Sequence, residues 1–423
     1  MRVLVVNHGF PPRFNAGSEI YSQTLVTGLL KAGHDVFVFS RMVNPFIDDF
    51  EVKQEMVKTD SIEYSLHLVN VARLKDRYVS RGVDLAFKEI IKKFKPEIVH
   101  FNHLNHLSIG IVEVAYNYGA RIVFTLHDFW LSCPRGQFLQ VNYGEASPHK
   151  LCGGQEDSKC AKKCYSRYFT GLDDTQDLVY WTNWIRFRRE AIGKLVKFVD
   201  VFISPSTTVG ERLQSELGLS DTQLQYLDYG FDLNKLSRRR RTVGEKVVFG
   251  YIGTHTISKG LHLLIDAFSQ LNEKAQLVIY GRERSETTPH LKEICSNLDV
   301  DWMPEYDNSQ IVEEVFEKVD VIVVPSIWLE NSPLVIHEVL QTRTLVITAD
   351  AGGMAEYVHD MENGLLFKHR DVESLRDTMQ KVVDNPSLIH DVGKRGYLHS
   401  ETGDVVSIEE HIKKIEGIYR RLC

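Results

Sequence analysis

Long apolar runs are missing from this sequence of 423 residues. No segment approaches the roughly 18 consecutive apolar residues that a membrane-spanning helix needs. The first strand-like run, "RVLVVN", follows Met1 without the basic, apolar and small-residue regions of a signal peptide. The sequence also has no basic surplus: it contains 50 Lys and Arg residues and 57 Asp and Glu residues, which gives a formal charge of −7. This charge argues against a dedicated nucleic-acid-binding protein. We therefore expect a cytoplasmic protein that binds no nucleic acid.

Cysteine use is ordinary for a chain of this length, with six residues, but four of them cluster in the stretch 129–170, which has few strand or helix signals. A loop-like insert of this kind needs a stabilising cross-link, and four thiolates could provide one by binding a structural zinc ion. The wide spacing does not match the tight paired-knuckle signature of zinc ribbons, so free thiols stay an alternative, and disulfides are disfavoured in a cytosolic protein. The candidate metal ligands are Cys133, Cys152, Cys160 and Cys164.

Short β-branched runs alternate with longer amphipathic stretches, in two series along the chain. Alternation of this kind predicts an α/β protein with two Rossmann-like domains, each built on a mostly parallel sheet. No GxGxxG follows the first run, so a dinucleotide-binding fold of the dehydrogenase kind is poorly supported. We place the first domain at 1–206, a linker and hinge region at 207–246, the second domain at 247–403 and a C-terminal helix within 404–423.

The loops after the strands of the second series carry candidate ligand-binding residues, because open parallel sheets bind ligands at the carboxyl ends of their strands. Lys259 lies before a predicted helix, where an ammonium group and a helix start both suit a phosphate. The stretch "SIWLENSPLVIHEVL" places Glu330 in a loop and Glu338 in the following helix, and carboxylates accept the paired hydrogen bonds of a sugar diol. Gly352 and Gly353 follow the next strand, where their backbone amides suit a diphosphate.

Helix starts and one histidine complete the pattern. Ser332 is expected to cap the helix whose first residue is Pro333. In the first series, Gly17 precedes Ser18, which we expect to cap the first helix, and His127 stands at a strand end. Each loop alone is equally well explained by an ordinary turn, a surface charge or a structural histidine. Their joint occurrence after strands of both series favours a ligand site.

These motifs resemble those of the retaining glycosyltransferases of family 4, also called glycosyl transferases group 1. The resemblance lies in the spacing of Glu330 and Glu338, the paired glycines after a strand, "ENGLLF", Lys259 followed by glycine, and the early "AGSE". It covers most of the chain and implies the GT-B fold, in which two Rossmann-like domains face a cleft and the C-terminal helix crosses back to the first domain. It also implies transfer of a sugar from a UDP- or GDP-sugar to an acceptor hydroxyl of a glycan, a lipid-linked saccharide or a small molecule, without a catalytic cofactor or metal.

The resemblance further implies roles for particular residues. His127, Glu330 and Lys259 would act at the reacting centre, with His127 bonded to a sugar hydroxyl, while Glu338 would hold the nucleotide ribose. Negative charge grows on the leaving diphosphate, so we expect same-face substitution assisted by that phosphate rather than a covalent glycosyl-Glu330 intermediate. The donor-binding set would comprise Gly17, Thr254, Lys259, Arg282, Glu330, Asn331, Ser332, Pro333, Leu334, Glu338, Gly352, Gly353 and Met354.

One departure from the family pattern concerns charge. The family pairs its phosphate lysine with an arginine, and here that position is Thr254, for which Arg282 in "IYGRERS" is the candidate replacement. The missing arginine leaves open a non-catalytic subunit that binds a sugar nucleotide. A sugar-nucleotide epimerase is a second alternative, because such enzymes can share this two-domain fold.

Two segments rich in arginine need a separate interpretation. The stretch 180–198 mixes tryptophan with arginine, and we expect a helix that packs its aromatic face on the sheet. The alternative is peripheral contact with the inner face of a membrane, where lipid-linked acceptors lie. The run "RRRR" at 238–241 is expected to be a solvated linker.

Overall fold

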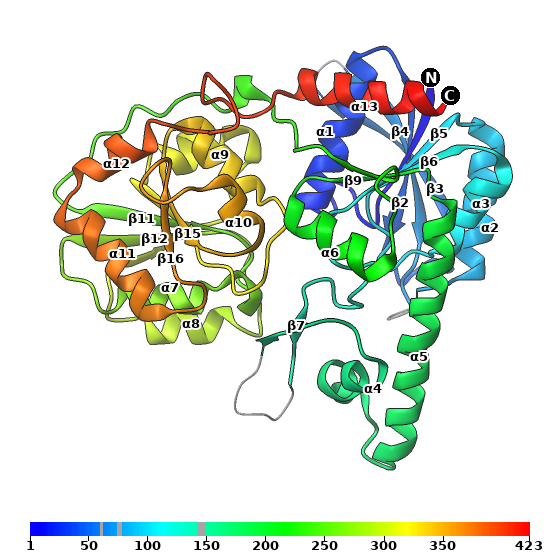
Figure 1. The fold of residues 1–423 in the computed structure, drawn as a ribbon, viewed down its shortest axis with the longest axis horizontal. Coiled ribbons are helices and arrows are strands. Elements are labelled where there is room, and N and C mark those ends of the chain that lie inside the picture. The colour runs from blue at the N-terminus through cyan, green and yellow to red at the C-terminus, as the bar shows by residue number, and fades with distance from the viewer. Residues whose placement is uncertain (60–61, 74–77, 143–148) are drawn as a thin grey trace. The chain divides into compact units, whose positions relative to one another are not determined.

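The computed structural model describes residues 1–59, 62–73, 78–142 and 149–423, which form two compact units (Figure 1). The first unit comprises Met1–Gly230 together with Ile408–Cys423, and the second comprises Phe231–Ser407. Within the described ranges, none of the helices combines the length and apolarity that crossing a membrane would require.

The first unit is built on an eight-stranded sheet in the order β10-β9-β6-β5-β1-β2-β4-β3. All neighbouring strands pair in parallel except β3 and β4, which form an antiparallel hairpin at one edge. The strands are β1 (Arg2–Val6), β2 (Asp35–Met42), β3 (Val52–Thr59), β4 (Ile62–Asn70), β5 (Ile98–Phe101), β6 (Arg121–Thr125), β9 (Val201–Ser204) and β10 (Leu224–Tyr226). The helices and turns are α1 (Gly17–Lys31), α2 (Arg81–Phe94), α3 (Gly110–Tyr118), α5 (Asp174–Leu195), η3 (Val196–Phe198), α6 (Thr207–Leu217) and α13 (Ile408–Leu422).

An insert between β6 and α5 adds a small substructure to the first unit. It contains the two-stranded antiparallel pair of β7 and β8, followed by short helices. Its elements are β7 (Leu139–Gln140), β8 (Lys150–Leu151), α4 (Asp157–Cys160), η1 (Ala161–Tyr165) and η2 (Ser166–Tyr168).

The second unit is built on a six-stranded, fully parallel sheet in the order β13-β12-β11-β14-β15-β16. The strands are β11 (Val247–Ile252), β12 (Ala275–Tyr280), β13 (Val300–Trp302), β14 (Val321–Val324), β15 (Leu345–Ala349) and β16 (Leu365–Phe367). The helices are α7 (Leu261–Phe268), α8 (Thr288–Ile294), α9 (Leu334–Thr342), α10 (Gly352–Tyr357), α11 (Val372–Asp384) and α12 (Ser387–Gly393), with short turns η4 (Leu233–Lys235), η5 (Ile257–Lys259), η6 (Asn308–Gln310) and η7 (Val312–Phe316).

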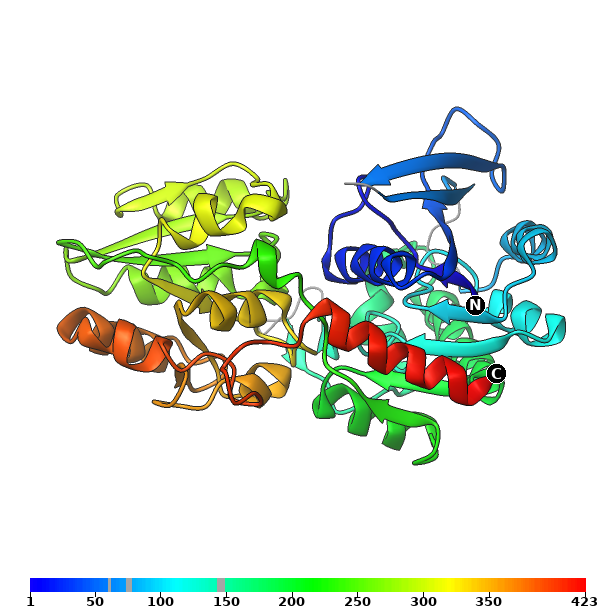
Figure 2. The same ribbon diagram turned by 90° about the horizontal axis from the view of Figure 1, so that it is seen from above.

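The C-terminal helix α13 belongs to the first unit, where it lies along α1 (Figure 2). Its apolar face is buried, and Ile412 occupies the space that a side chain at Gly28 of α1 would need. Tyr419 adds a hydrogen bond between its hydroxyl group and His100 Nδ1 over 2.6 Å. These contacts confirm the predicted fold class of two parallel-sheet domains with a C-terminal helix that returns to the first.

The basic run at 238–241 is not the solvated segment that we expected. Arg241 forms a two-pronged ion pair with Asp320, at 2.8 and 3.2 Å, and Arg239 donates to the carbonyl oxygen of Val319 over 2.7 Å. Asp320 is fully buried, so its charge needs these partners. Of the region 207–246, α6 and β10 belong to the first unit, and the boundary between the units falls after Gly230.

The aromatic face of α5 also packs differently from our expectation. Trp181 and Trp184 lie against Tyr165 of the insert, with ring centroids 4.8 and 5.4 Å away, rather than on the sheet. Tyr168 adds a further stacked contact with Trp181 at 5.2 Å. The tryptophans therefore attach the insert to α5.

Candidate active site

Lys259 joins the loops that follow β11 and β14 in the second unit. Its ammonium group donates a hydrogen bond to Glu330 Oε1 over 2.6 Å and lies 5.7 Å from the centre of the Trp328 ring. The next residue, Gly260, has φ +73°, and a Cβ atom there would lie 1.8 Å from the carbonyl oxygen of Pro325, so only glycine fits. The Lys259 side chain is 37% exposed, which leaves part of the positive charge open to solvent.

Glu330 is the buried centre of this cluster, with a relative exposure of 5%. Ser326 Oγ donates a second hydrogen bond to the same oxygen, Oε1, over 2.6 Å. The ammonium and the hydroxyl together compensate the cost of burying the carboxylate. Because both bonds end on Oε1, the other oxygen, Oε2, has no hydrogen-bond partner among the described residues.

The two glycines at the start of α10 pack against the backbone of the Glu330 loop. The Gly353 amide donates to the carbonyl oxygen of Glu330 over 2.8 Å, and a Cβ atom on Gly353 would lie 1.2 Å from the carbonyl oxygen of Asn331. Gly352 has φ +58°, and a Cβ atom on it would lie 2.9 Å from the Cα atom of Leu329. The Gly353 amide that we expected to face a diphosphate is thus bonded to the loop, and the glycines hold Glu330 in place.

Glu338 lies in α9, apart from the contacts of Lys259. Burial raises the pKa of Glu338 to about 7, against a smaller opposing influence of His337. Tyr306 is a neighbour, since burial and then the charge of Glu338 raise the pKa of its hydroxyl. At neutral pH, Glu338 therefore exchanges between an acid that can donate and a carboxylate that accepts.

Both predicted helix starts differ from the structure. Pro333, not Ser332, precedes the first residue of α9, and no side chain caps this helix. Helix α1 begins at Gly17 after Ala16, and the predicted cap, Ser18, donates instead to the carboxylate of the next residue over 2.9 Å. These shifts are of one or two residues, which is the ordinary uncertainty of helix ends.

The remaining predicted donor-binding residues of the second unit make other contacts or are buried. Thr254 accepts a hydrogen bond from Tyr251 at its carbonyl oxygen over 3.1 Å, and Arg282 is paired with Glu305 at 3.4 Å. A cation that the sequence interpretation missed is Arg370, which donates to the carbonyl oxygen of Ile327 over 3.2 Å. Of the others, Asn331, Ser332, Pro333 and Met354 are buried and Leu334 is half-buried.

The first unit gathers polar side chains at the carboxyl ends of β1, β5 and β6. His127 is hydrogen-bonded through Nδ1 to the Tyr229 hydroxyl at 2.7 Å and through Nε2 to Asn102 Oδ1 at 3.3 Å. Burial lowers the pKa of His127 well below its usual value, and the charges of His103 and His100 add to this, so the ring is neutral at physiological pH.

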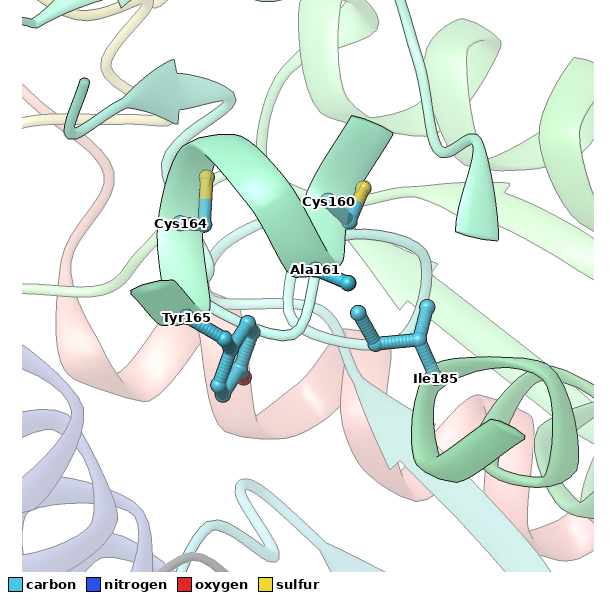
Figure 3. Packing of buried hydrophobic residues seen from close by; sticks show 5 residues of the cluster. All are labelled: Cys160, Ala161, Cys164, Tyr165 and Ile185. Atoms are coloured by element: carbon cyan, nitrogen blue, oxygen red, sulfur yellow. The ribbon is translucent and has the colours of Figure 1, made fainter. Parts of the chain in front are cut away.

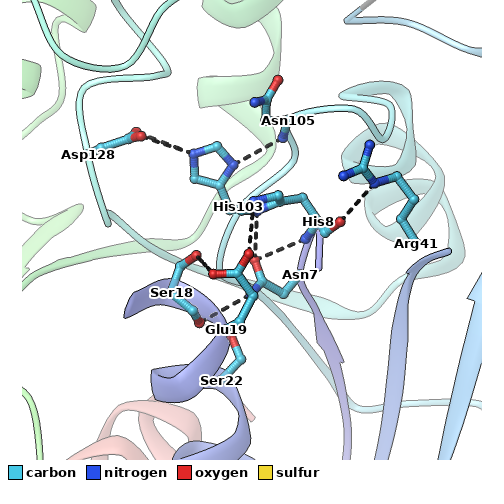
Figure 4. Close-up of polar contacts among 9 residues, drawn as sticks. All are labelled: Asn7, His8, Ser18, Glu19, Ser22, Arg41, His103, Asn105 and Asp128. Atoms are coloured by element: carbon cyan, nitrogen blue, oxygen red, sulfur yellow. Dashed lines mark hydrogen bonds and ion pairs between the residues drawn. The ribbon is translucent and has the colours of Figure 1, made fainter. Parts of the chain in front are cut away.

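A second polar group at these strand ends was not anticipated from the sequence (Figure 4). His8 lies 3.3 Å from the buried Glu19, and His103 lies 3.3 Å from Asp128. The rings of His8 and His103 are 4.5 Å apart and connect the two pairs. His8 and His103 each stand just after a strand, which is the signal that the sequence offered for a polar group here. The two residues are far apart in the sequence, however, so their contact was not evident. The cysteines predicted as metal ligands lie elsewhere, in the insert.

Two parallel-sheet units, a C-terminal helix that returns to the first, and a lysine–carboxylate–glycine cluster at the strand ends of the second define the class as a glycosyltransferase of the GT-B type. Comparison with protein families agrees with this class. Residues 16–235 match Glycosyltransferase Family 4, and residues 234–399 match Glycosyl transferases group 1. The first match alone covers more than half of the chain, so the chain belongs to glycosyltransferase family 4, which confirms the resemblance found in its motifs.

Individual relatives are distant but span most of the chain. The D-inositol 3-phosphate glycosyltransferase of Corynebacterium diphtheriae is 20% identical over 95% of this chain and 89% of its own length. An uncharacterized glycosyltransferase of Methanocaldococcus jannaschii is 26% identical over 91% and 90%. Among solved structures, sucrose-phosphate synthase from Thermosynechococcus elongatus has a TM-score of 0.69 with 18% identity, over 100% of this chain and 98% of that one. Anabaena HepE in complex with UDP has a TM-score of 0.67 with 14% identity, over 100% of both chains.

Proposed function

We propose that this glycosyltransferase moves a sugar from a nucleoside diphosphate sugar to an acceptor hydroxyl with retention of anomeric configuration. The observation that supports it most is the cluster of Lys259, Glu330 and Gly353 at the strand ends of the second unit. A UDP-sugar is the first donor to test, because HepE has been solved with UDP and with UDP-glucose.

The roles of the donor-binding side chains follow from their free hydrogen-bonding capacity. The Lys259 ammonium has three donors, of which one is used by Glu330, so the others are available to a diphosphate. Glu330 Oε2 is available to a hydroxyl group of the transferred sugar, and Glu338 to the ribose. Cleavage of the bond from the sugar to diphosphate places negative charge on the phosphate, and a fixed cation next to it stabilises the transition state.

Same-face substitution is the mechanism that this geometry favours. A carboxylate that acts as a nucleophile needs high electron density on its oxygen atoms. At Glu330, the Lys259 ammonium and the Ser326 hydroxyl group both donate to Oε1 and lower that density. In the proposed step the acceptor oxygen forms its bond to the anomeric carbon as the bond to diphosphate breaks, and the acceptor proton passes to the departing phosphate. For the first unit we propose a role on the acceptor side, in which Nε2 of the neutral His127 ring exchanges its 3.3 Å hydrogen bond to Asn102 for one to a sugar hydroxyl.

The experiment is a thermal-shift screen of UDP-, GDP- and ADP-sugars, followed by NMR analysis of the product formed from the stabilising donor. A ligand that binds only the folded state raises its apparent stability by mass action. We expect transfer with retention, and no glycosyl-Glu330 adduct by mass spectrometry when a 2-fluoro donor is used. Release of an altered nucleotide sugar without acceptor would indicate an epimerase instead. Binding without turnover over a broad acceptor panel would indicate a non-catalytic subunit.

A further inference from the structure

Four of the six cysteines line a single pocket in the insert of the first unit, although they are spread between residues 133 and 164. Cys133 comes from the turn after β6, Cys152 follows β8, and Cys160 and Cys164 lie on the helical turns of α4 and η1. Figure 3 shows the sulfur atoms of Cys160 and Cys164 directed away from Tyr165 and Ile185. The fold therefore places four thiols around one point.

The turn that carries Cys133 surrounds its sulfur with backbone amides. Gly136, with φ +77°, donates to the carbonyl oxygen of Cys133 over 2.8 Å and closes the turn. Burial raises the pKa of the Cys133 thiol, and backbone hydrogen bonds from Arg135, Gln137 and Phe138 oppose this rise. A neutral thiol is a weak acceptor, whereas a thiolate is a strong one, so converging amides suit a thiolate at this position.

Two cations lie close to cysteines of the same pocket. Arg188 of α5 is 1% exposed, and its Nη1 has no hydrogen-bond partner among the described residues. Its guanidinium lies over the Trp130 ring at 4.5 Å, and Cys133 and Asp128 are close enough for a negative charge on them to stabilise it. Lys159 adds a second cation close to Cys152. The half-buried Lys159 is already paired with Glu156 at 2.7 Å, so the buried Arg188 is the cation that gains most from further negative charge in the pocket.

We propose that this pocket binds one zinc ion through the thiolates of Cys133, Cys152, Cys160 and Cys164, as a structural site. Binding replaces the four thiol protons, which are released to solvent, and the resulting complex carries a charge of −2, part of which Arg188 beside Cys133 and Lys159 beside Cys152 offset. In the structure the sulfur atoms line the pocket. Within the described ranges, no three His, Cys, Asp or Glu side chains lie close enough together, as they are placed, to hold a metal ion. The ion therefore draws the sulfur atoms inward to a tetrahedron with bonds of about 2.3 Å.

The site would attach the insert to the strand end that carries His127. Phe129 donates to the carbonyl oxygen of Gly136 over 3.0 Å, and Cys133 donates to the carbonyl oxygen of Phe129 over 2.7 Å. The turn held by the metal thus begins two residues after His127. The proposal concerns structure and does not depend on the reaction proposed above.

Metal analysis of untagged protein, purified under reducing conditions, tests the proposal. We expect about one zinc per chain, falling below about 0.1 in the double variant Cys160→Ser/Cys164→Ser. The matched control Cys295→Ser/Cys423→Ser removes the two cysteines outside the pocket and should keep about one zinc. Absence of zinc from the wild-type protein, iron in its place, or unchanged zinc in the first variant would overturn the assignment.

A cobalt titration of wild-type protein stripped of metal provides a readout that does not require a folded variant. Tetrahedral Co²⁺ with four thiolates gives intense d–d absorption and a sulfur-to-metal charge-transfer band, which zinc should then abolish. A weak octahedral spectrum, or disulfides among these cysteines in anaerobically prepared protein, would contradict the proposal.

Discussion

Substitution of Gly353 by alanine tests the part of the site that depends most on close packing. The new Cβ atom would lie 1.2 Å from the carbonyl oxygen of Asn331, whereas ordinary contact begins near 3.4 Å. The start of α10 and the Glu330 loop must therefore separate by about 2 Å. The hydrogen bond between them and the 2.6 Å contact of Glu330 with Lys259 cannot both survive that displacement.

The expected loss follows from how strongly catalysis depends on position. A misplacement of 1 Å at a reacting centre costs about 100-fold in rate, so kcat/KM for Gly353→Ala should fall at least ~100-fold, or about 2.7 kcal/mol. Overpacking alone should cost about 1–3 kcal/mol of stability, which leaves the protein folded.

The assay is nucleotide release with saturating acceptor, accompanied by a melting curve for each variant. Gly193→Ala is the matched control, because it adds the same methyl group to a helical glycine with no heavy atom within 4 Å. Wild-type kcat/KM in folded Gly353→Ala would refute the reasoning, as would an equal loss in both variants.

Two further predictions concern charge. The carboxylate form of Glu338 accepts hydrogen bonds from both hydroxyl groups of a ribose, and burial raises the pKa of Glu338 to about 7. Because protonation removes this form, the affinity for UDP should weaken as the pH falls from about 8 to 6, by up to about tenfold per pH unit. Glu338→Gln should remove this pH dependence of UDP binding. The raised pKa lowers the folding stability of the wild type as the pH rises from 4.5 to about 7, so the variant should gain stability relative to the wild type over that interval. Identical pH profiles for the wild type and the variant would exclude the assignment. Arg241→Ala should destabilise the protein by about 3–5 kcal/mol in urea unfolding, because it leaves the buried charge of Asp320 poorly compensated, whereas the exposed neighbour Arg240→Ala should have little effect. Equal unfolding midpoints for the two arginine variants would show that the ion pair contributes nothing.

The gathering of Lys259, Glu330 and the two glycines could be predicted because successive parallel strands end at one edge of a sheet. The sequence places these loops at that edge, and the sheet order β11-β14-β15 then makes them neighbours. What each glycine does could not be predicted, since a glycine that admits a ligand and one that admits another backbone segment look the same in the sequence. Gly353 is of the second kind in this structure.

The basic run and the polar group of the first unit were misjudged or missed for a related reason. A run of arginines is usually solvated, and nothing near it in the sequence reveals the buried Asp320 that Arg241 reaches. Likewise His8 and His103 follow different strands, and only the order of β1 and β5 in the sheet makes them neighbours. Pairings across long sequence separations depend on topology and packing, which local patterns do not encode.

The central claim is that Lys259 holds the diphosphate of the donor, and calorimetric titration with UDP tests it most directly. Lys292 offers a matched control, since its ammonium also lies 2.6 Å from a glutamate oxygen and 5.3 Å from the centre of a tryptophan ring. Unlike Lys259, Lys292 lies within a helix, α8, rather than in a loop after a strand. Lys259→Ala should weaken UDP binding at least ~10-fold, the value of a charge-assisted hydrogen bond, while Lys292→Ala should bind like the wild type. Equal affinity of UDP for the wild type and for folded Lys259→Ala would contradict the account.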